Sequence, residues 1–526
     1  MNLYLVLTKL KDFYHEDDKR IFASLYYSGY DFEMGENVLV EENLDDEFIA
    51  MLPIKVESLE HLLWKWLPDT LNEIHGVDFP PRLWKRMLHF WTRPLLFNLC
   101  CKYSRIKYIL SKYHSDLVHI ATLKSEEYQY IRDLVEFPLQ MENEKYDFQL
   151  WTKTALKLFE RGNYFQNIPV GYGMETRGNK NSDIAMEDFK QAYKNFQRRY
   201  FNRLKKTLGL LLNGKFIDLK NFLSRFYWEE VRNPNLAKCY LYYPDFSSSL
   251  FEKLICESHA DIRSLPRRIV TDSYKFDSMV PNTGNRQVLE KICMENLADC
   301  SDEERDILTI AISEIPMCYL EFFKKIRNQY EAYLVSDVKF LISRYGVYRN
   351  TSFLFYALEM HERNGCELRS IQHGGDYQIV DNPYIWDLTL SDRVYCWGDP
   401  SMNARFIASA SFKLNEYVHY ERLSSRHTSG ILFVERPIFS YLFRCVLDKE
   451  NVGWIEREIN FFLNLLPRAR EHVTIREFVG DYSWNRKNLL KKRVSGLRYG
   501  SVTEQFMSLL CHCELCICEY LGTTWL

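Results

Sequence analysis

The sequence lacks any long uncharged apolar run. The nearest candidate, 87–101, is interrupted by Arg93 and Pro94 and is shorter than the roughly 18 residues that a membrane-spanning helix needs. An ordinary membrane-spanning helix is therefore not expected, and only peripheral association with a membrane stays open. The chain also has no secretory opening, because the apolar residues 1–7 run directly into the polar and charged segment 8–12. We expect a cytoplasmic protein, with a place at the inner face of the cell membrane left open.

The sequence also lacks an excess of charge of either sign. Its 68 lysines and arginines nearly balance 71 aspartates and glutamates, which gives a formal net charge of -3. Domains that bind nucleic acid usually carry a basic excess, so we expect no nucleic acid partner. The 14 cysteines are scattered through a large chain, which favours reduced thiols over a disulfide framework.

Metal-binding patterns are missing as well. The spacing of Cys511, Cys513, Cys516 and Cys518 is not that of a zinc ribbon or finger, and buried thiols on an apolar strand explain it more simply. The sequence has no metal-binding Asp-x-Asp pattern in a suitable loop. We therefore predict no metal site and no cofactor, and a reaction that proceeds without an obligatory cation.

The sequence does contain a regular alternation of strand and helix signals. From residue 236 onward, short apolar segments such as 338–343 and 431–434 alternate with helical patterns such as 351–363. This alternation predicts the α/β class with doubly wound parallel sheets, in which ligands bind beyond the carboxyl ends of the strands. Two apolar stripes at helical spacing, within 57–75 and 83–91, predict buried helices in the first half.

Length and pattern together suggest two domains. At ~150 residues per domain, 526 residues correspond to two to four units. We assign residues 1–385 to a first Rossmann-like domain, with a largely helical insertion at about 55–230, and residues 386–526 to a second. The second alternation is still open where the chain stops, so we expect this domain to be incomplete.

The segment 371–377, Ile-Gln-His-Gly-Gly-Asp-Tyr, carries the strongest chemical signal. It ends a predicted strand, and its paired glycines, Gly374 and Gly375, let the backbone take positive φ and let a ligand come close. His373 beside them can donate, accept or take up a proton near neutral pH. The pattern is typical of an active-site loop at a strand end. A buried turn in which His373 only hydrogen-bonds a carbonyl is equally compatible.

Several further motifs occur in a fixed order along the chain. They are Leu71–Val77 with Arg82-Leu83-Trp84, the segment 372–377, Ser391-Asp392-Arg393 before Trp397-Gly398, Arg476 with Asp481-Tyr482-Ser483-Trp484, and Glu519-Tyr520-Leu521-Gly522-Thr523-Thr524. Together they resemble a bacterial family of surface-carbohydrate (O-antigen type) transferases with glycosyltransferase-B architecture, distantly related to CDP-glycerol glycerophosphotransferases. The chain departs from the family pattern at Thr8, where a threonine-rich turn is usual, and at Trp386 and Asp387.

The resemblance implies a glycosyltransferase that moves a sugar from a nucleotide-activated donor to a lipid-linked or oligosaccharide acceptor, in the synthesis of lipopolysaccharide O-antigen or capsule. Such a reaction needs a base for the acceptor hydroxyl and positive or hydrogen-donating groups for the departing phosphate. His373 is the candidate base or donor, and Asp376 and Asp387 are competing carboxylates. The predicted substrate-binding or nucleotide-binding residues are Gln372, Gly374, Gly375, Arg436, Arg476, Asp481, Tyr482, Gly522, Thr523 and Thr524.

Alternatives remain for individual residues and for the whole protein. Arg476 can clamp a diphosphate or pair with Asp481, and Thr523 and Thr524 can bind phosphate or only cap a helix. A polyol phosphotransferase acting on CDP-glycerol or a similar donor would use the same residues. A catalytically inactive nucleotide-binding or scaffolding protein is the third reading, suggested by the changes at Trp386 and Asp387.

Overall fold

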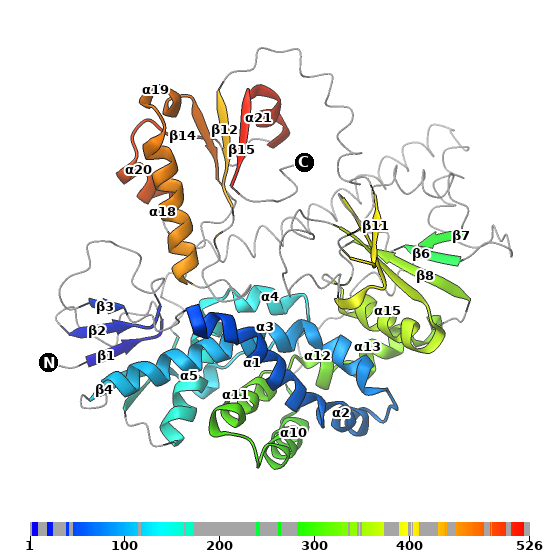
Figure 1. Ribbon diagram of the computed structural model, residues 1–526. Helices are drawn as coiled ribbons and strands as arrows, with labels where there is room; N and C mark the ends of the chain where they lie inside the picture. The colour runs from blue at the N-terminus through cyan, green and yellow to red at the C-terminus, as the bar shows by residue number, and fades with distance from the viewer. Residues whose placement is uncertain are drawn as a thin grey trace, which may run out of the picture.

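The structure is a computed structural model in which part of the chain is described. The described residues are 3–8, 18–24, 38–40, 46–113, 117–161, 165–172, 238–241, 261–264, 281–334, 337–344, 347, 350–372, 389–397, 401, 403–409, 430–436, 438, 448–477, 484, 486–500 and 506–519. They form three parallel β-sheets, called A, B and C below, with helices packed on and between them (Figure 1).

Sheet A is built from the first part of the chain in the order β3-β2-β1-β4-β5, with every neighbouring pair parallel. Its strands are β1 (Leu3–Val6), β2 (Lys19–Phe22), β3 (Val38–Val40), β4 (Val118–Leu123) and β5 (Gln166–Val170). The side chains of β1 and β4 are buried along their whole length, as expected for central strands covered on both faces. The apolar runs 2–7 and 116–121 of the sequence predict a strand at each of these places.

A layer of helices joins sheet A to sheet B. Its members are α1 (Asp46–Trp64), α2 (Leu67–His75), α3 (Pro81–Lys112), α4 (Glu136–Met141), α5 (Glu144–Glu160), α10 (Thr283–Asn296), α11 (Asp302–Ser313), α12 (Met317–Leu320) and α13 (Phe323–Tyr330), with short 3-10 turns at Ser125–Glu127 and Glu331–Tyr333. Helix α3 lies at its centre, because it packs against α1, α5, α11 and α15 (Thr351–Asn364). Helix α5 in turn packs on β4, and α15 packs on β9 (Glu367–Ile371).

The sequence of this layer explains its helices. The predicted stripe residues Leu83, Trp84, Met87, Leu88 and Trp91 are all fully or almost fully buried on α3, which confirms them as core. The helical pattern over 302–334 predicts a single helix, but the structure divides it into α11, α12 and α13. Pro316 lies between the first two of these, and proline cannot supply the N–H that a continuing helix needs.

Sheet B has the order β11-β10-β9-β8-β6-β7, again with parallel neighbours throughout. Its strands are β6 (Lys238–Leu241), β7 (Asp261–Ser264), β8 (Val338–Ser343), β9, β10 (Arg393–Cys396) and β11 (Phe406–Ala408). In chain order the sheet reads 2-1-3-4-5-6, a doubly wound arrangement whose strand order reverses between β6 and β8. The predicted helix 351–363 and the strand that leads to His373 are confirmed as α15 and β9.

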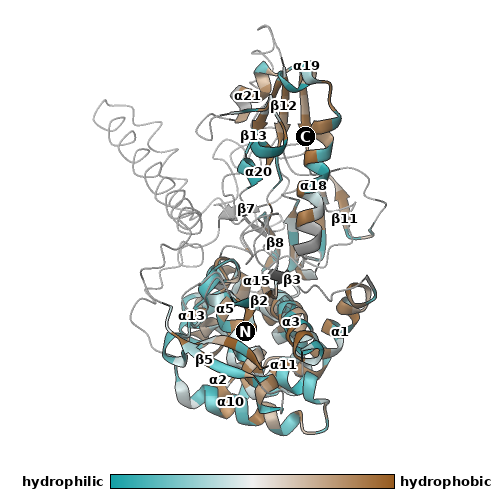
Figure 2. Ribbon diagram, turned by 90° about the vertical axis from the view of Figure 1, so that its left-hand side faces the viewer, coloured by the Kyte–Doolittle hydropathy of each residue, from teal (hydrophilic) through white to brown (hydrophobic). Residues whose placement is uncertain are grey.

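Sheet C, near the end of the chain, has the order β14-β13-β12-β15 and is also fully parallel. Its elements are β12 (Ile431–Val434), α18 (Asp448–Asn464), α19 (Pro467–Arg470), β13 (Val473–Arg476), α20 (Arg486–Arg493), β14 (Arg498–Tyr499), α21 (Phe506–His512) and β15 (Leu515–Cys518). Phe433 of β12 stacks on Phe461 and meets Phe462 edge-on, so α18 covers one face of the sheet. Figure 2 shows the hydrophobic residues gathered on the strands of this sheet.

The α/β class and the parallel sheets agree with the sequence-based prediction. The described residues form three sheets, and β1 and β4 belong to sheet A and not to the sheet of β9. Strand β10, which follows residue 385, pairs with β9, and β11 pairs with β10. The division at residue 385 and the glycosyltransferase-B arrangement stay predictions. The apolar segment 268–272, which predicts a further strand, lies outside the described residues.

Candidate functional site

The candidate site is the carboxyl edge of sheet C. The strand order 3-2-1-4 reverses between β12 and β15, and open parallel sheets bind ligands beyond the carboxyl ends of the strands at such a point. Glu435 and Arg436 follow β12, and Glu519 follows β15. The Arg436 N–H donates to Glu519 Oε2 at 2.9 Å, and the Glu519 N–H donates to the carbonyl of Val434 at 3.1 Å. Local backbone bonds therefore fix the charged residues at the point of reversal.

Arg436 and Arg476, two of the predicted nucleotide-binding residues, are brought to neighbouring strand ends. Val434 pairs in register with Arg476, and the Glu435 N–H donates to the carbonyl of Arg476 at 3.1 Å. The guanidinium of Arg436 lies 3.3 Å from the ring centroid of Trp454 on α18. This cation–π contact orients the Arg436 side chain at the edge. A direct role of either arginine in binding stays a prediction.

Behind this edge lies a cluster that we call the Arg486 cluster, made of Arg486, Glu435, Glu458 and Glu519. Arg486, the first residue of α20, donates from Nε to Glu458 Oε2 at 2.6 Å and from Nη2 to Glu519 Oε2. Its Nη1 donates to the carbonyl of Arg436 at 3.0 Å. Glu435 Oε1 lies 3.6 Å from Arg486 Nε, which is too long for a hydrogen bond. Within this cluster, Arg486 is therefore the single cation beside three carboxyl groups.

Burial dominates the protonation of this cluster. Removal from water, helped by the neighbouring carboxylates and opposed by Arg486, raises the pKa of Glu435 to about 8 and that of Glu458 to about 7. The three carboxylates raise the pKa of Arg486 above its ordinary value although burial alone would lower it. At neutral pH the raised pKa favours the protonated form of Glu435.

The carboxyl edge of sheet B carries a different kind of arrangement. Gln372, directly after β9, is 2% exposed. Its side-chain Oε1 accepts the N–H of Trp397 at 2.8 Å, and its own N–H donates to the carbonyl of Tyr395 at 2.9 Å. Gln372 thus ties the end of β9 to the end of β10 immediately before His373. Its predicted contact with substrate stays a prediction.

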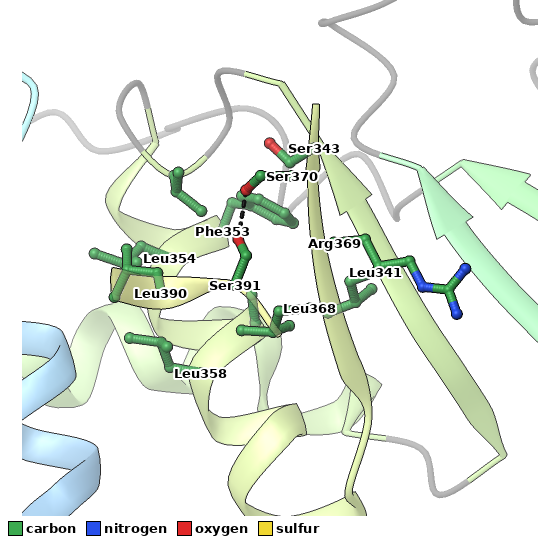
Figure 3. A pocket seen from close by; sticks show the side chains of 12 residues that line it. Leu341, Ser343, Phe353, Leu354, Leu358, Leu368, Arg369, Ser370, Leu390 and Ser391 are labelled. Carbon is green, nitrogen blue, oxygen red and sulfur yellow. Dashed lines mark hydrogen bonds between the residues drawn. The ribbon is translucent and has the colours of Figure 1, made fainter. Parts of the chain in front are cut away.

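A small hollow lies under this edge, between sheet B and α15 (Figure 3). Ser370 and Ser391 hydrogen-bond to each other through their hydroxyl groups, and Ser343 lies on the adjacent strand. The rest of the lining is mostly apolar, with leucine, phenylalanine, valine and alanine residues besides Arg369. The cavity measures about 10 Å³, which is about the least space that holds one water molecule. It is a packing defect and is too small for a substrate.

Two of the motifs that carry the resemblance have structural partners. In the first, Asn72 bonds the N–H and the carbonyl of Phe79 and accepts Trp84 Nε1–H at 2.8 Å, so it fastens α2 to α3. His75 Nε2 lies 2.8 Å from the carbonyl of Tyr319, and burial lowers the pKa of His75 to about 4. In the second, Asp392 Oδ2 accepts the N–H of Leu368 at 2.7 Å.

Many of the predicted residues lie outside the described part of the chain, and their roles stay predictions. They are His373, Gly374, Gly375, Asp376, Asp387, Asp481, Tyr482, Gly522, Thr523 and Thr524. Sequence reasoning missed Glu435, Glu458, Trp454 and Arg486. For Glu435 a signal existed, since it stands between an apolar strand and the predicted Arg436. Nothing in the sequence pairs Glu458 with Arg486.

The predictions about cysteines, metal ions and membrane-spanning helices can be compared with the described residues. Cys516 Sγ and Cys518 Sγ lie 3.8 Å apart on the same side of β15, as the strand pattern predicted. Among the described residues, no group of three or more His, Cys, Asp or Glu side chains could hold a metal ion. Within the same part of the chain, no helix combines the length and the apolar character needed to cross a membrane.

Fold and site together define an α/β protein with parallel sheets and a charged carboxyl edge at the reversal of strand order. The chain belongs to the LIC12162 family of transferases, because the profile described as LIC12162 family transferase matches residues 3–526. No curated protein and no solved structure matches the chain. The family supports the predicted transferase class over the whole chain, without saying which group is moved.

Proposed function

We propose that the protein is a glycosyltransferase that moves a sugar from a nucleotide-activated donor to a lipid-linked or oligosaccharide acceptor in bacterial surface polysaccharide synthesis. The observation that carries the proposal is the position of Arg436. It is the second residue after β12, where the strand order of sheet C reverses, in a chain that belongs to a transferase family. A guanidinium there can hold a diphosphate with two parallel hydrogen bonds.

In this proposal the carboxyl edge of sheet B supplies the base, and the carboxyl edge of sheet C binds the nucleotide phosphates. The acceptor hydroxyl attacks the anomeric carbon of the donor sugar, and His373 takes the hydroxyl proton. The bond from the anomeric carbon to the phosphate oxygen breaks, and the nucleotide leaves with the electron pair. Arg436 and Arg476 offset the negative charge that grows on the phosphate. Gln372 directly precedes His373, and its hydrogen bond with Trp397 after β10 holds this point of the chain in place.

The test is product analysis with a panel of nucleotide sugars and CDP-glycerol, on the wild-type chain and two histidine variants. His373→Ala should lower turnover by about 10²-fold or more, the usual scale for loss of a general acid or base. His472→Ala is the matched control, because His472 is an exposed residue at the opposite, amino end of β13. It should leave turnover unchanged.

The outcomes separate the alternatives. Transfer of a sugar supports the proposal, whereas transfer of a polyol phosphate identifies a phosphotransferase that uses the same edge. Nucleotide binding without any transfer identifies an inactive binding protein. Full activity in His373→Ala removes His373 from the mechanism.

A further inference from the structure

The charges of the Arg486 cluster do not balance when all of its groups are ionised. One guanidinium faces three carboxylates, which would leave a net charge of about -2 behind the edge that is proposed to bind a diphosphate. The next cation along α20, Lys487, is engaged with Glu477 at 2.7 Å. Arg436 is held over Trp454. A fully ionised cluster would therefore repel an anionic ligand.

The hydrogen bonds of the cluster are also incomplete. Glu435 Oε1, Glu458 Oε1 and the hydroxyl of Tyr499 on β14 are buried and have no hydrogen-bond partner. Glu435 is 7% exposed, and it is the one of these three that stands directly at the end of β12. Buried polar atoms without partners are rare in folded proteins and call for an explanation. A metal ion is not that explanation among the described residues, since no suitable group of ligands exists there.

We propose that Glu435 keeps a proton in the ligand-free protein and donates it in a hydrogen bond to a phosphate oxygen of the bound nucleotide. Nucleotide binding is thereby coupled to the protonation of the Arg486 cluster. The proposal rests on the nucleotide site proposed above and adds a second phosphate-binding residue beside Arg436. The proton stays on Glu435, so no bond to it is broken. It removes one negative charge from the edge and turns a repelling group into a donor.

The raised pKa of Glu435, about 8, sets the size of the effect. If one proton must be retained for binding, the nucleotide Kd should rise about tenfold between pH 7 and pH 9. The ionisation of the phosphate itself does not interfere, because its second pKa is about 6. The groups that face Glu435 are Glu458 from α18, Arg486 from α20, Glu477 after β13, Tyr499 from β14 and Glu519 after β15.

The experiment is isothermal titration of the full chain with CDP and ADP, whose bases do not ionise in this range, at pH 7, 8 and 9. Wild type should show the tenfold rise in Kd for any nucleotide that binds. Glu435→Gln, which mimics the protonated carboxyl in shape, should bind at pH 7 within a few-fold of wild type and show no change up to pH 9. Glu456→Gln is the matched control on α18, where Glu456 pairs with Arg493 away from the cluster.

A second readout needs no ligand. The infrared band of a protonated carboxyl group should be present in the ligand-free protein at pH 7 and reduced in Glu435→Gln, but not in Glu456→Gln. Nucleotide binding with a Kd that is independent of pH in wild type, or an unchanged pH dependence in Glu435→Gln, overturns this inference alone. Failure of both nucleotides to bind wild type overturns the inference together with the assignment of this edge to CDP or ADP. Sugar transfer from another nucleotide donor would then keep the proposed function.

Discussion

Arg486 Nε lies 2.6 Å from Glu458 Oε2, and this buried ion pair joins α20 to α18 behind the carboxyl edge of sheet C. The same guanidinium also holds Glu519 and the carbonyl of Arg436, so one side chain links the two helices to the ends of β12 and β15. The arrangement gives the edge a fixed geometry before any ligand arrives, and it makes the fold of this part of the chain depend on a single residue.

Arg486→Met should therefore destabilise the protein strongly. It leaves the buried Glu458 without the cation that it contacts at 2.6 Å, and breaking a buried ion pair in this way typically costs about 3–5 kcal/mol. Arg493→Met on the same helix is the control, because Arg493 is partly exposed and its pair with Glu456 should contribute about 0.5 kcal/mol or less. Urea unfolding of both variants measures the difference. Equal losses would contradict the role given to Arg486.

The raised pKa values of Glu435 and Glu458 predict that the protein loses stability as pH rises from about 4.3 to about 8. Their ordinary pKa is about 4.3 in the unfolded chain, so between pH 4.3 and about 8 the folded state binds more protons. The free energy of unfolding should fall as pH rises through this window, at up to about 1.4 kcal/mol per pH unit and proton. Unfolding of wild type and Glu435→Gln at pH 5.5, 7 and 8.5 tests this. The free energy of unfolding of Glu435→Gln should increase relative to that of wild type as pH rises. A difference between the two that does not change with pH would refute the raised pKa of Glu435.

The lowered pKa of His75 predicts a loss of stability as pH falls. Burial lowers its pKa to about 4, so between pH 6.5 and 4 the unfolded chain binds the proton and the folded protein does not. The contribution of His75 to the free energy of unfolding should be fully present above pH 6.5 and should decrease as pH falls to 4. His75→Gln should lose stability at pH 7, because it disturbs the contact with the Tyr319 carbonyl, but the gap to wild type should narrow at pH 4.5. A gap that does not change with pH would contradict the lowered pKa.

Gly430 at the start of β12 should not accept a side chain. Its φ is +89°, and a Cβ placed there would lie 2.9 Å from the carbonyl oxygen of His472, an atom of the neighbouring strand that cannot easily move. Gly365 at the end of α15 has φ +62° but open space around it. Gly365→Ala should cost about 1 kcal/mol for the left-handed conformation alone, and Gly430→Ala clearly more. Thermal unfolding of the two variants compares them, and equal Tm values would refute the clash.

Much of the fold could be predicted from the sequence where local pattern and tertiary structure agree. Apolar runs identified β1, β4 and β12, because central strands of parallel sheets are largely buried on both faces. The charged residues in β2 and β7, Lys-Arg-Ile-Phe and Asp-Ile-Arg-Ser, hide these strands from the same reasoning. Without β2, β3 and β5, sheet A could not be recognised as a sheet of its own.

The site was predictable only in part, for a similar reason. Arg436 and Arg476 could be found because each stands at the end of an apolar strand, where ligands bind in parallel sheets. Glu458 and Arg486 are charged residues within helical patterns, which normally face solvent. Only the packing of α18 against α20 turns them toward each other and toward the edge. Such a pairing is a property of the tertiary structure, and no local spacing encodes it.

The central claim is that a nucleotide binds at the carboxyl edge of sheet C. A crystal structure of the full chain with a bound nucleoside diphosphate measures this most directly. The account predicts phosphate density beyond the ends of β12 and β15, within hydrogen-bond distance of Arg436. Phosphate density at sheet A, or at the amino ends of the strands of sheet C, would contradict it.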